Sequence, residues 1–258
     1  MGWLPRTGRG PAARPAETRP CLRLIVPTPA GFRREPHPAG INRFLWKLIR
    51  IFSGAIRRRV GAMAWSIWLA LAAASYLIGS IPFAFLVGKL WTGIDIRKGG
   101  SGNVGATNLF RLAGWGPGLL GFLLDFAKGF GPALAGLHLG GPVGGLLIGL
   151  AAVAGHNWSV YLRGRGGKGA ATSLGVLVAV APVGALVAVA LFVLVVLATR
   201  YVSLGSMTAA ASAPVTLWLL GAGRAEVLIA ALLTVILVLR HRSNIARLLA
   251  GTENRANY

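Results

Sequence analysis

Long apolar stretches separated by short polar segments run through most of this chain. Residues 64–88 contain no charged side chain, and a helix of this length, at about 1.5 Å per residue, crosses a hydrocarbon core of about 30 Å. The stretch at 170–199 is too long for one span, so we divide it at Pro182. The pattern predicts an all-α polytopic membrane protein with seven transmembrane helices, the others being at 115–137, 140–162, 203–220 and 227–239.

Composition supports this prediction and gives it an orientation. The chain is 55% hydrophobic and only 13% charged, whereas about a quarter of the residues of a soluble domain are charged. With seven spans, the segments 89–114, 162–169 and 240–258 and the turn at Arg200 lie on one side of the membrane. They carry nearly all the Lys and Arg of residues 63–258. Since positively charged loops stay in the cytoplasm, we expect these segments to face it.

Residues 1–62 differ from the rest in composition. They hold 13 of the 27 Lys and Arg residues. The first 40 residues lack apolar periodicity and are predicted to be disordered, whereas residues 41–60 have the pattern of a helix on an anionic membrane surface. A nucleic-acid-binding arm is one alternative, and translation that starts at Met63 is another. Seven spans would place this basic extension outside, against the positive-inside tendency, so either Met63 is the start or the span count is wrong.

The first polar segment with candidate chemistry is residues 99–111, GGSGNVGATNLFR. It combines a flexible glycine backbone with small polar side chains and one cation, which together can wrap an oxyanion. The alternative is an ordinary capped turn with Thr107 and Asn108 as its cap residues. Polar groups beside lipid are costly unless they line a wet site, which favours the anion cradle. The candidate donors are Ser101, Asn103, Thr107, Asn108 and Arg111.

The second polar segment is residues 163–172, RGRGGKGAAT. Its glycine spacing matches a dinucleotide fingerprint, but no β-α-β unit surrounds it, and Gly169 stands where a nucleotide P-loop needs Ser or Thr. What remains is a glycine-rich turn with Arg163, Arg165 and Lys168 at the start of a helix, whose dipole favours an anion. Cations that face lipid headgroups are the alternative, which explains Arg163 but not the four glycines.

The third polar segment is residues 240–255, RHRSNIARLLAGTENR, where His241, Asn244 and Glu253 lie among four arginines. A basic helix on the membrane surface is the alternative interpretation. His156, in the inner half of the third span, belongs with the second segment, although a lone histidine in a span is more often a packing residue.

Two further charges lie inside the second predicted span. Asp125 and Lys128 are three residues apart on one helix face and can pair with each other. Intramembrane charges suggest a function by default, although a structural pair satisfies the same energetics.

The chemistry that the chain lacks narrows its function. Residues 63–258 contain four acidic residues, too few for the carboxylate cluster of a metal-dependent lipid phosphotransferase, and Cys21 is the only cysteine. No histidine is followed by Asp at the fifth position, as in the commonest soluble-type acyltransferases. Phosphate-binding cations without a metal or a strong base indicate a substrate that is already activated. An anion transporter or channel is the alternative from another class, although its polar groups would lie near the membrane midplane.

At these three segments the chain resembles the bacterial acyl-phosphate-dependent glycerol-3-phosphate acyltransferases, the PlsY family, over roughly residues 66–255. The family motifs have the forms SGNxGATNxxR, here 101–111; GHxxxxxxxxKGGKGxAT, here 155–172; and HxxNIxRLxxGTExK, here 241–255. Three long motifs in the same order make the resemblance specific.

The resemblance implies seven membrane helices, with the motifs on the cytoplasmic side of the bacterial cytoplasmic membrane. It implies transfer of a fatty acyl group from acyl phosphate to the 1-hydroxyl of glycerol 3-phosphate, which gives lysophosphatidic acid and phosphate without a metal or cofactor. The partners that it allows are membrane lipids and the enzyme that produces acyl phosphate, with no nucleic acid. The catalytic residues that it implies are Ser101, Arg111, Lys168, His241 and Asn244. The substrate-binding residues that it implies are Gly102, Asn103, Thr107, Asn108, His156, Gly166, Gly167, Gly169, Ser206 and Glu253.

Three residues depart from the family pattern. Arg165 and Arg255 stand where lysine is usual, and Gly205 replaces one of two small hydroxyl residues before Ser206. Both arginines keep the charge, so we expect the activity to be retained. The change at Gly205 puts the contribution of that position to binding in doubt.

Overall fold

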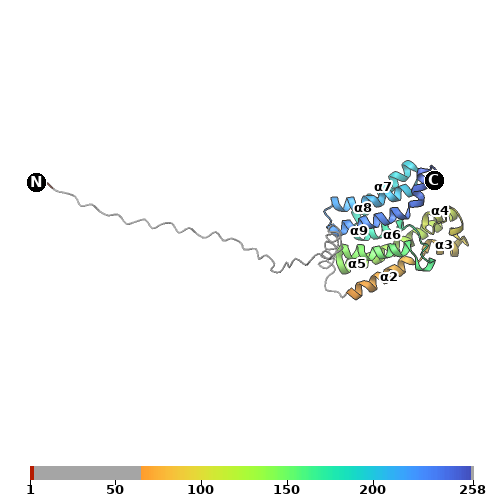
Figure 1. The fold of residues 1–258 in the computed structure, drawn as a ribbon, viewed down its shortest axis with the longest axis horizontal. Coiled ribbons are helices and arrows are strands. Elements are labelled where there is room, and N and C mark those ends of the chain that lie inside the picture. The colour runs from red at the N-terminus through yellow and green to blue at the C-terminus, as the bar shows by residue number, and fades with distance from the viewer. Residues whose placement is uncertain (3–64, 257–258) are drawn as a thin grey trace, which may run out of the picture. The chain divides into compact units, whose positions relative to one another are not determined.

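The computed structural model describes residues 1–2 and 65–256. Apart from the first two residues, the predicted extension at 1–62 and its amphipathic segment at 41–60 lie outside the described residues. Within the described part of the chain every regular element is a helix, and the helices of residues 65–256 pack into a bundle (Figure 1). The prediction of an all-α fold is confirmed.

The first apolar stretch forms two helices, α2 (Trp65–Ser80) and α3 (Phe83–Thr92). The predicted first span at 64–88 is therefore built from two helices, which together form one candidate membrane span at Trp65–Thr92. Pro82 stands at the break, because its ring leaves no N–H to donate to the preceding turn. Since the stretch carries no charge, hydropathy alone gave no sign of this break.

Side chains from other elements bind the backbone at this break. Ser159 Oγ donates to the Ser80 carbonyl at 2.5 Å, and Lys128 Nζ donates to the Ile81 carbonyl at 2.6 Å. Carbonyls at a helix end need such partners when water is excluded. The break is thus stabilised by hydrogen bonds from residues that lie far along the chain.

The segment at 89–114, predicted as a polar loop, contains two short helices. η1 is a 3-10 helix at Ile96–Lys98, and α4 spans Ala106–Ala113. Ile96 and Leu109 are fully buried in a small apolar cluster with Ala84 of α3. The first polar segment therefore rests on a packed support and is not an open loop.

The longest element, α5 (Trp115–Asn157), folds back on itself at Gly140 and Gly141, whose backbone angles are not helical. Gly141 has a φ of 63°, in the left-handed region that glycine adopts readily. Asp125 and His156 lie about equally far from this bend, yet Asp125 Oδ1 and His156 Nδ1 are 3.8 Å apart. The two arms of α5 are therefore antiparallel neighbours, and they correspond to the predicted second and third spans.

Glycines let the helices of the bundle approach closely. A Cβ atom at Gly136 would collide with the backbone at Gly144 in the opposite arm of α5. A Cβ at Gly129 would collide with the Thr172 carbonyl of α6, and one at Gly155 would collide with the backbone of α2. Small residues at such contacts are typical of helices that pack in lipid.

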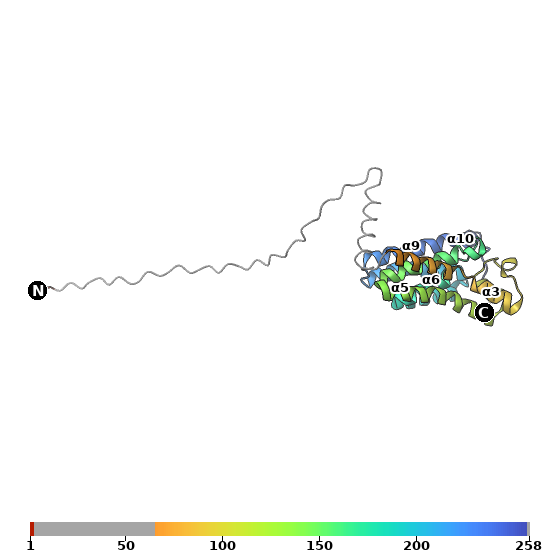
Figure 2. The ribbon, with the colours of Figure 1, turned by 90° about the horizontal axis from the view of Figure 1, so that it is seen from below.

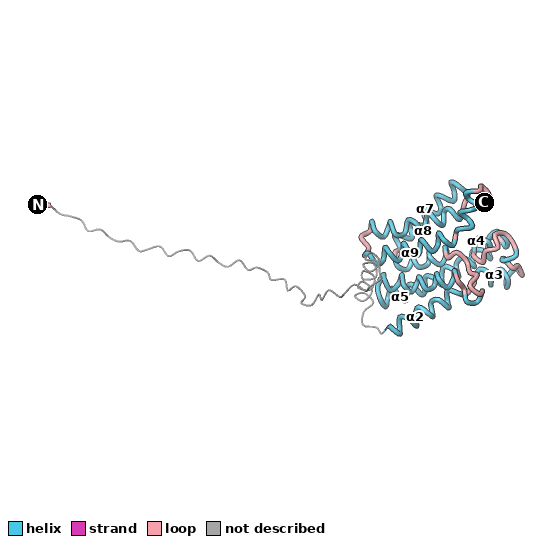
Figure 3. The backbone as a smooth tube through the Cα atoms, in the orientation of Figure 1, coloured by secondary structure: helices cyan, strands magenta, loops and turns pink. Residues whose placement is uncertain are grey.

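The helices that follow are α6 (Ala170–Val180), α7 (Pro182–Thr199), α8 (Val202–Leu219), α9 (Arg224–Arg240) and α10 (Arg242–Leu249). α6 and α9 pack against α5, α8 packs against α9, and α7 packs against α8 (Figures 1 and 2). As predicted, the run at 170–199 is divided at Pro182, which is the first residue of its helix. Figure 3 shows that loops gather beside α3 and α4, at the end of the bundle where the chain's last described residues also lie.

The outer surface of the bundle is apolar. On α7, Leu186, Leu194 and Leu197 are each more than 60% exposed, which would be costly in water and suits contact with lipid. Among the described residues, four helical segments are long and apolar enough to cross a membrane: Trp65–Thr92, Trp115–Leu162, Pro182–Thr199 and Val202–Leu219. One of these, Trp115–Leu162, contains both antiparallel arms of α5.

Candidate active site

Asn108 organises the first polar segment. Its side chain is 1% exposed, and its Nδ2 donates to the carbonyls of Ile96, Gly99 and Asn103 at 2.7 to 3.2 Å. Its Oδ1 accepts the Ser101 N–H at 2.8 Å. The amide is thus occupied by bonds within the segment, so Asn108 shapes the loop that presents Ser101.

Asn103 and Gly102 form the turn of this loop. Asn103 Oδ1 accepts the Gly105 N–H at 2.9 Å, an Asx-type bond that replaces a backbone partner. Gly102 has a φ of 67°, where a side chain would be strained. Thr107 is exposed on the first turn of α4 and has no capping bond there.

The second polar segment packs tightly against the end of α5. The Gly167 N–H donates to the His156 carbonyl at 3.0 Å, and a Cβ atom at Gly167 would collide with His156 Nε2. A Cβ at Gly166 would collide with the His156 carbonyl. Gly169 has a φ of 83° and is the cap residue of α6, which begins at Ala170 as predicted. His156 therefore packs against the glycine turn and accepts a hydrogen bond from its backbone.

Lys168 leaves this turn and meets the third polar segment. Its Nζ donates to Asn244 Oδ1 at 2.5 Å, and Asn244 Nδ2 donates to Glu253 Oε1 at 2.6 Å. Glu253 also accepts from Ser203 Oγ at 2.8 Å and from Arg247 Nε at 2.7 Å. Because Glu253 fixes the direction of the Asn244 amide, the amide oxygen faces Lys168.

Cations outnumber anions around Lys168. Burial lowers its pKa to about 8; Glu253 raises the pKa, whereas Arg247, Arg111 and Arg240 each lower it. Burial also lowers the pKa of Arg111. The charge of Glu253 raises this pKa, and that of Arg247 lowers it. Because these groups affect one another's pKa values, cations from all three polar segments lie close together around Lys168. An added phosphate would relieve their repulsion.

Glu253 is the carboxylate that faces these cations, and it stays charged. Burial alone would raise its pKa, but hydrogen bonds from Asn244, Ser203 and Arg247 outweigh this and lower it. Oε1 accepts from Ser203 and Asn244 and Oε2 accepts from Arg247, so Glu253 fixes the positions of these three side chains.

His241 lies at the junction of α9 and α10 and is 3% exposed. Its Nδ1 is 2.8 Å from the Leu237 carbonyl, which fits the tautomer with the proton on Nδ1. Burial lowers the pKa of His241 to about 4, although the Leu237 carbonyl raises it and Lys168 lowers it further. The ring is therefore neutral at pH 7, and its Nε2 lone pair can accept a hydrogen bond.

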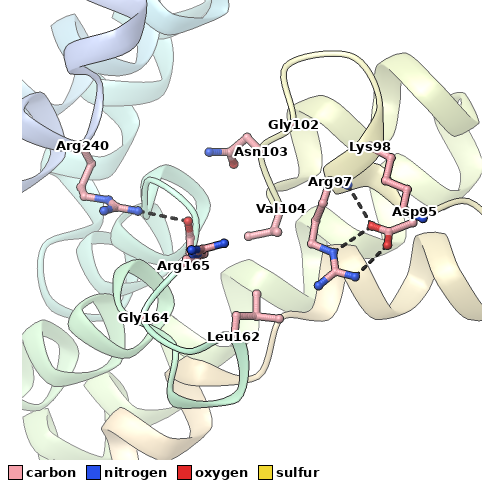
Figure 4. A pocket seen from close by; sticks show the side chains of 11 residues that line it. Asp95, Arg97, Lys98, Gly102, Asn103, Val104, Leu162, Gly164, Arg165 and Arg240 are labelled. Carbon is pink, nitrogen blue, oxygen red and sulfur yellow. Dashed lines mark hydrogen bonds and ion pairs between the residues drawn. The ribbon is translucent and has the colours of Figure 1, made fainter.

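A pocket of about 610 Å³ lies between the first and second polar segments. Figure 4 shows Arg97, Lys98 and Asn103 on one side and Arg165 and Arg240 on the other. Among the cations, Arg97 pairs with Asp95 at 2.7 Å, and Asp95 is the single acidic residue of the lining. The pocket is therefore strongly basic, and its volume suits a small phosphate ester.

Asp125 and Lys128 pair as predicted, with Lys128 Nζ 2.7 Å from Asp125 Oδ1. Both side chains are almost fully buried, and Lys128 also holds the break between α2 and α3. Within the part of the chain that the structure describes, no three of the His, Cys, Asp and Glu side chains come close enough together to hold a metal ion.

Comparison with known proteins identifies the family. A sequence model described as glycerol-3-phosphate acyltransferase matches residues 69–251. The glycerol-3-phosphate acyltransferase of Desulforudis audaxviator is 48% identical over 184 residues, which cover 71% of this chain and 93% of that protein. Glycerol-3-phosphate acyltransferase 2 of Moorella thermoacetica is 46% identical over 188 residues, which cover 73% of this chain and 97% of that protein. The chain belongs to the glycerol-3-phosphate acyltransferase family.

Solved structures of the family agree with the fold. The glycerol 3-phosphate form of PlsY (YgiH), an integral membrane glycerol 3-phosphate acyltransferase, is 43% identical and superposes with a TM-score of 0.71. The alignment covers 74% of this chain and 96% of that protein. The lysophosphatidic acid form of PlsY is 42% identical, with a TM-score of 0.68, and its alignment covers 74% and 95% of the two chains. The resemblance to this family and the prediction of an acyltransferase are confirmed.

The glycerol-3-phosphate acyltransferase fold brings some predicted site residues together and leaves others aside. Lys168, Asn244 and Glu253 are joined by hydrogen bonds. Arg111 and His241 lie close enough for the charge of Glu253 to affect their pKa values. Ser206, by contrast, donates its hydroxyl to the Val202 carbonyl within α8.

Sequence reasoning missed several residues at this site, among them Ser203 and Arg240. Ser203, one turn before Ser206, reaches Glu253, and Arg240 binds the glycine turn of the second segment. No spacing signal marked Ser203. Arg240 could have been found from its position directly before His241.

Proposed function

We propose that this acyltransferase moves a fatty acyl group from acyl phosphate to the 1-hydroxyl of glycerol 3-phosphate. The hydroxyl oxygen bonds to the acyl carbon, the bond from that carbon to the phosphate oxygen breaks, and the hydroxyl proton passes to the departing phosphate. The products are lysophosphatidic acid and inorganic phosphate. Phosphate is a stable leaving group, so the enzyme mainly positions two anions and offsets developing charge.

The observation that carries this proposal is that two basic sites lie on opposite sides of one glycine turn. Lys168 lies on one side, in a cluster with Arg111, and the basic pocket lies beside Arg165 and Gly166. Two phosphate-bearing substrates need two such places. The cradles are compact, which suits the small phosphate group of acyl phosphate better than the large nucleotide of acyl-CoA.

Roles follow from the donors and acceptors that remain available. Arg111 and Lys168 bind phosphate oxygens and stabilise the charge that develops on the attacked carbonyl. Ser101, His241 and Asn244 hold the acceptor: a carbonyl oxygen has two lone pairs, so Asn244 Oδ1 can accept from a hydroxyl as well as from Lys168. The neutral His241 Nε2 accepts from the second hydroxyl of glycerol 3-phosphate, so the two acceptors together orient the molecule.

The donor assay tests this proposal directly. Purified protein is incubated with glycerol 3-phosphate and either acyl phosphate or acyl-CoA, and lysophosphatidic acid is measured. We expect product with acyl phosphate and none with acyl-CoA in a preparation free of acyl phosphate. Comparable turnover with acyl-CoA would refute the choice of donor.

The same proposal includes a topology of seven spans. The two arms of α5 count separately because they are antiparallel, and α2, α6, α7, α8 and α9 supply the other five. This count puts the three polar segments on one side of the membrane. Their excess of Lys and Arg makes that side the cytoplasmic one in a bacterial cytoplasmic membrane.

A further inference from the structure

The carbonyl oxygens of the glycine turn in the second polar segment point toward one guanidinium group. Arg240 Nη2 lies 3.0 Å from the Gly166 carbonyl and 2.8 Å from the Gly167 carbonyl, and Arg240 Nε lies 3.1 Å from the Gly167 carbonyl. Three of the five guanidinium N–H groups are therefore used by backbone oxygens. The guanidinium carbon also lies 5.7 Å from the centre of the Trp158 ring, within the range of a cation–π contact.

Fixing two successive carbonyls also fixes the N–H groups that follow them. A peptide unit is planar and trans, so each N–H points opposite to the carbonyl of the same unit. The N–H that follows the Gly166 carbonyl belongs to Gly167 and donates to the His156 carbonyl at 3.0 Å. The N–H that follows the Gly167 carbonyl belongs to Lys168 and points away from Arg240. Glycine has no intrinsic preference that would hold this arrangement by itself.

The third polar segment therefore holds the turn and the lysine that follows it at two points. Arg240, the last residue of α9, holds the backbone before Lys168, and Asn244 in α10 accepts from the Lys168 ammonium. Gly167 is buried, so its carbonyl would lose a partner that water cannot readily replace if the guanidinium were removed.

We propose that Arg240 is a positioning residue that sets the conformation of the Gly166–Gly167 turn and thereby the place of Lys168. This inference rests on the proposed role of Lys168 as a phosphate-binding cation. Arg240 also lines the basic pocket, but three of its five N–H groups are bound to the backbone, so we assign its role to the turn. The fork shape of the guanidinium is what the two carbonyls need, and a lysine ammonium is a point donor that cannot reproduce it.

Kinetics separate positioning from direct phosphate binding. If Arg240 bound a substrate phosphate directly, Arg240→Lys would lose the forked contact and would mainly raise the KM for that substrate. Positioning predicts that Arg240→Lys lowers kcat about 10²-fold, the usual scale for a displacement of about 1 Å at a reacting group. The KM for glycerol 3-phosphate should change less than about threefold, since binding contacts remain. Arg242→Lys, at an exposed site two residues away, is the matched control and should keep wild-type kinetics.

Hydrogen exchange of the substrate-free protein gives a readout that does not depend on activity. We expect the Gly167 amide to exchange faster in Arg240→Lys than in wild type and Arg242→Lys, because its bond to His156 loosens. Unchanged exchange there, or wild-type kcat in Arg240→Lys, would overturn the proposal. If the wild-type protein failed to use acyl phosphate while the exchange still rose, the donor assignment would be wrong and the positioning role would stand. Arg240→Gln, which lacks the charge, should show the same exchange and a lower kcat still.

Discussion

Lys168 and Asn244 are 76 positions apart in the chain, yet the Lys168 ammonium donates to the Asn244 amide oxygen at 2.5 Å. This bond joins the second polar segment to the third across α6 to α9. Each residue had been predicted to belong to the catalytic centre, but their direct contact was not predicted. Because this contact fixes the position of the Lys168 ammonium, removal of the lysine side chain should have a specific effect on turnover.

Lys168→Ala and Arg111→Ala should each lower turnover about 10²–10³-fold, the cost of losing one preorganised donor at a developing charge. Arg163→Ala is the control: Arg163 is exposed, and such surface charges contribute about 0–1 kcal/mol. Turnover is compared at equal amounts of folded protein. Near wild-type rates in either of the first two variants, or equal collapse in all three, would mean that the site is misplaced.

The pH dependence should follow Lys168. Its pKa of about 8 means that the ammonium is present below that pH and lost above it. We therefore expect kcat/KM, which reports the free enzyme, to fall as pH rises through about 8. In Lys168→Arg the fall should move to higher pH, because a guanidinium keeps its proton. The second phosphate ionisation of the substrate, near pH 6, does not interfere. A flat wild-type profile up to pH 10 would contradict this assignment.

Glu253→Gln should disturb Asn244 without removing it. The new amide group places a donor where Asn244 Nδ2 or Arg247 Nε also donates, so the bonds to the carboxylate cannot all be kept. We expect a loss of about 1–3 kcal/mol in the free energy of unfolding and at least a tenfold lower kcat. Thermal unfolding and turnover are measured together. Asn254→Ala, at the exposed neighbouring position, should change neither, and a wild-type kcat in Glu253→Gln would show that Asn244 needs no orientation.

The buried Asp125–Lys128 pair should be structural. Asp125→Asn leaves the Lys128 ammonium without its counter-ion in an apolar bundle, and breaking such a pair typically costs about 3–5 kcal/mol. The double variant Asp125→Asn with Lys128→Met should recover part of this loss in a thermal unfolding assay. The recovery should be incomplete, because Lys128 also binds the Ile81 carbonyl. Lys89→Met, at an exposed position, is the control for loss of a lysine.

The proposed topology is tested with single cysteines in a Cys21→Ala background. Exposed positions suit the labelling reagent best, so we choose Lys98, Arg163 and Ser243 near the three polar segments, and Arg224 in the opposite turn. An impermeant maleimide should label Arg224→Cys in intact cells and the other three only after the membrane is opened. Labelling of any of those three in intact cells would show that the span count is wrong.

The sequence predicted the helices better than their ends. Charge-free runs must satisfy their backbone internally in lipid, and helices do so, which is why the runs around α7, α8 and α9 were found. Pro182 was recognised because its run was too long for one span. Pro82 was not, since the run at 64–88 has an ordinary length and a proline can start a helix without changing hydropathy. The amphipathic α4 was too short to stand out from a loop.

The sequence predicted which residues belong to the site but not which of them form hydrogen bonds with each other. Asn108 was predicted as an anion donor, and the family resemblance implied that Glu253 binds substrate; in the structure both side chains make internal hydrogen bonds. Which donor meets which acceptor depends on tertiary distances, such as that between Ser203 and Glu253, 50 residues apart. Glycine spacing located the second segment correctly, yet the arginine that binds its carbonyls lies in another helix.

Glu253 lies after α10, yet it fixes the Asn244 amide that faces Lys168. Its bonds to Ser203 and Arg247 tie this last part of the described chain to α8 and α10. Truncation of the chain before Glu253 would therefore leave every apolar helix in place and release only the Asn244 amide. A small loss at the C-terminal end of the protein would thus damage the site and spare the bundle.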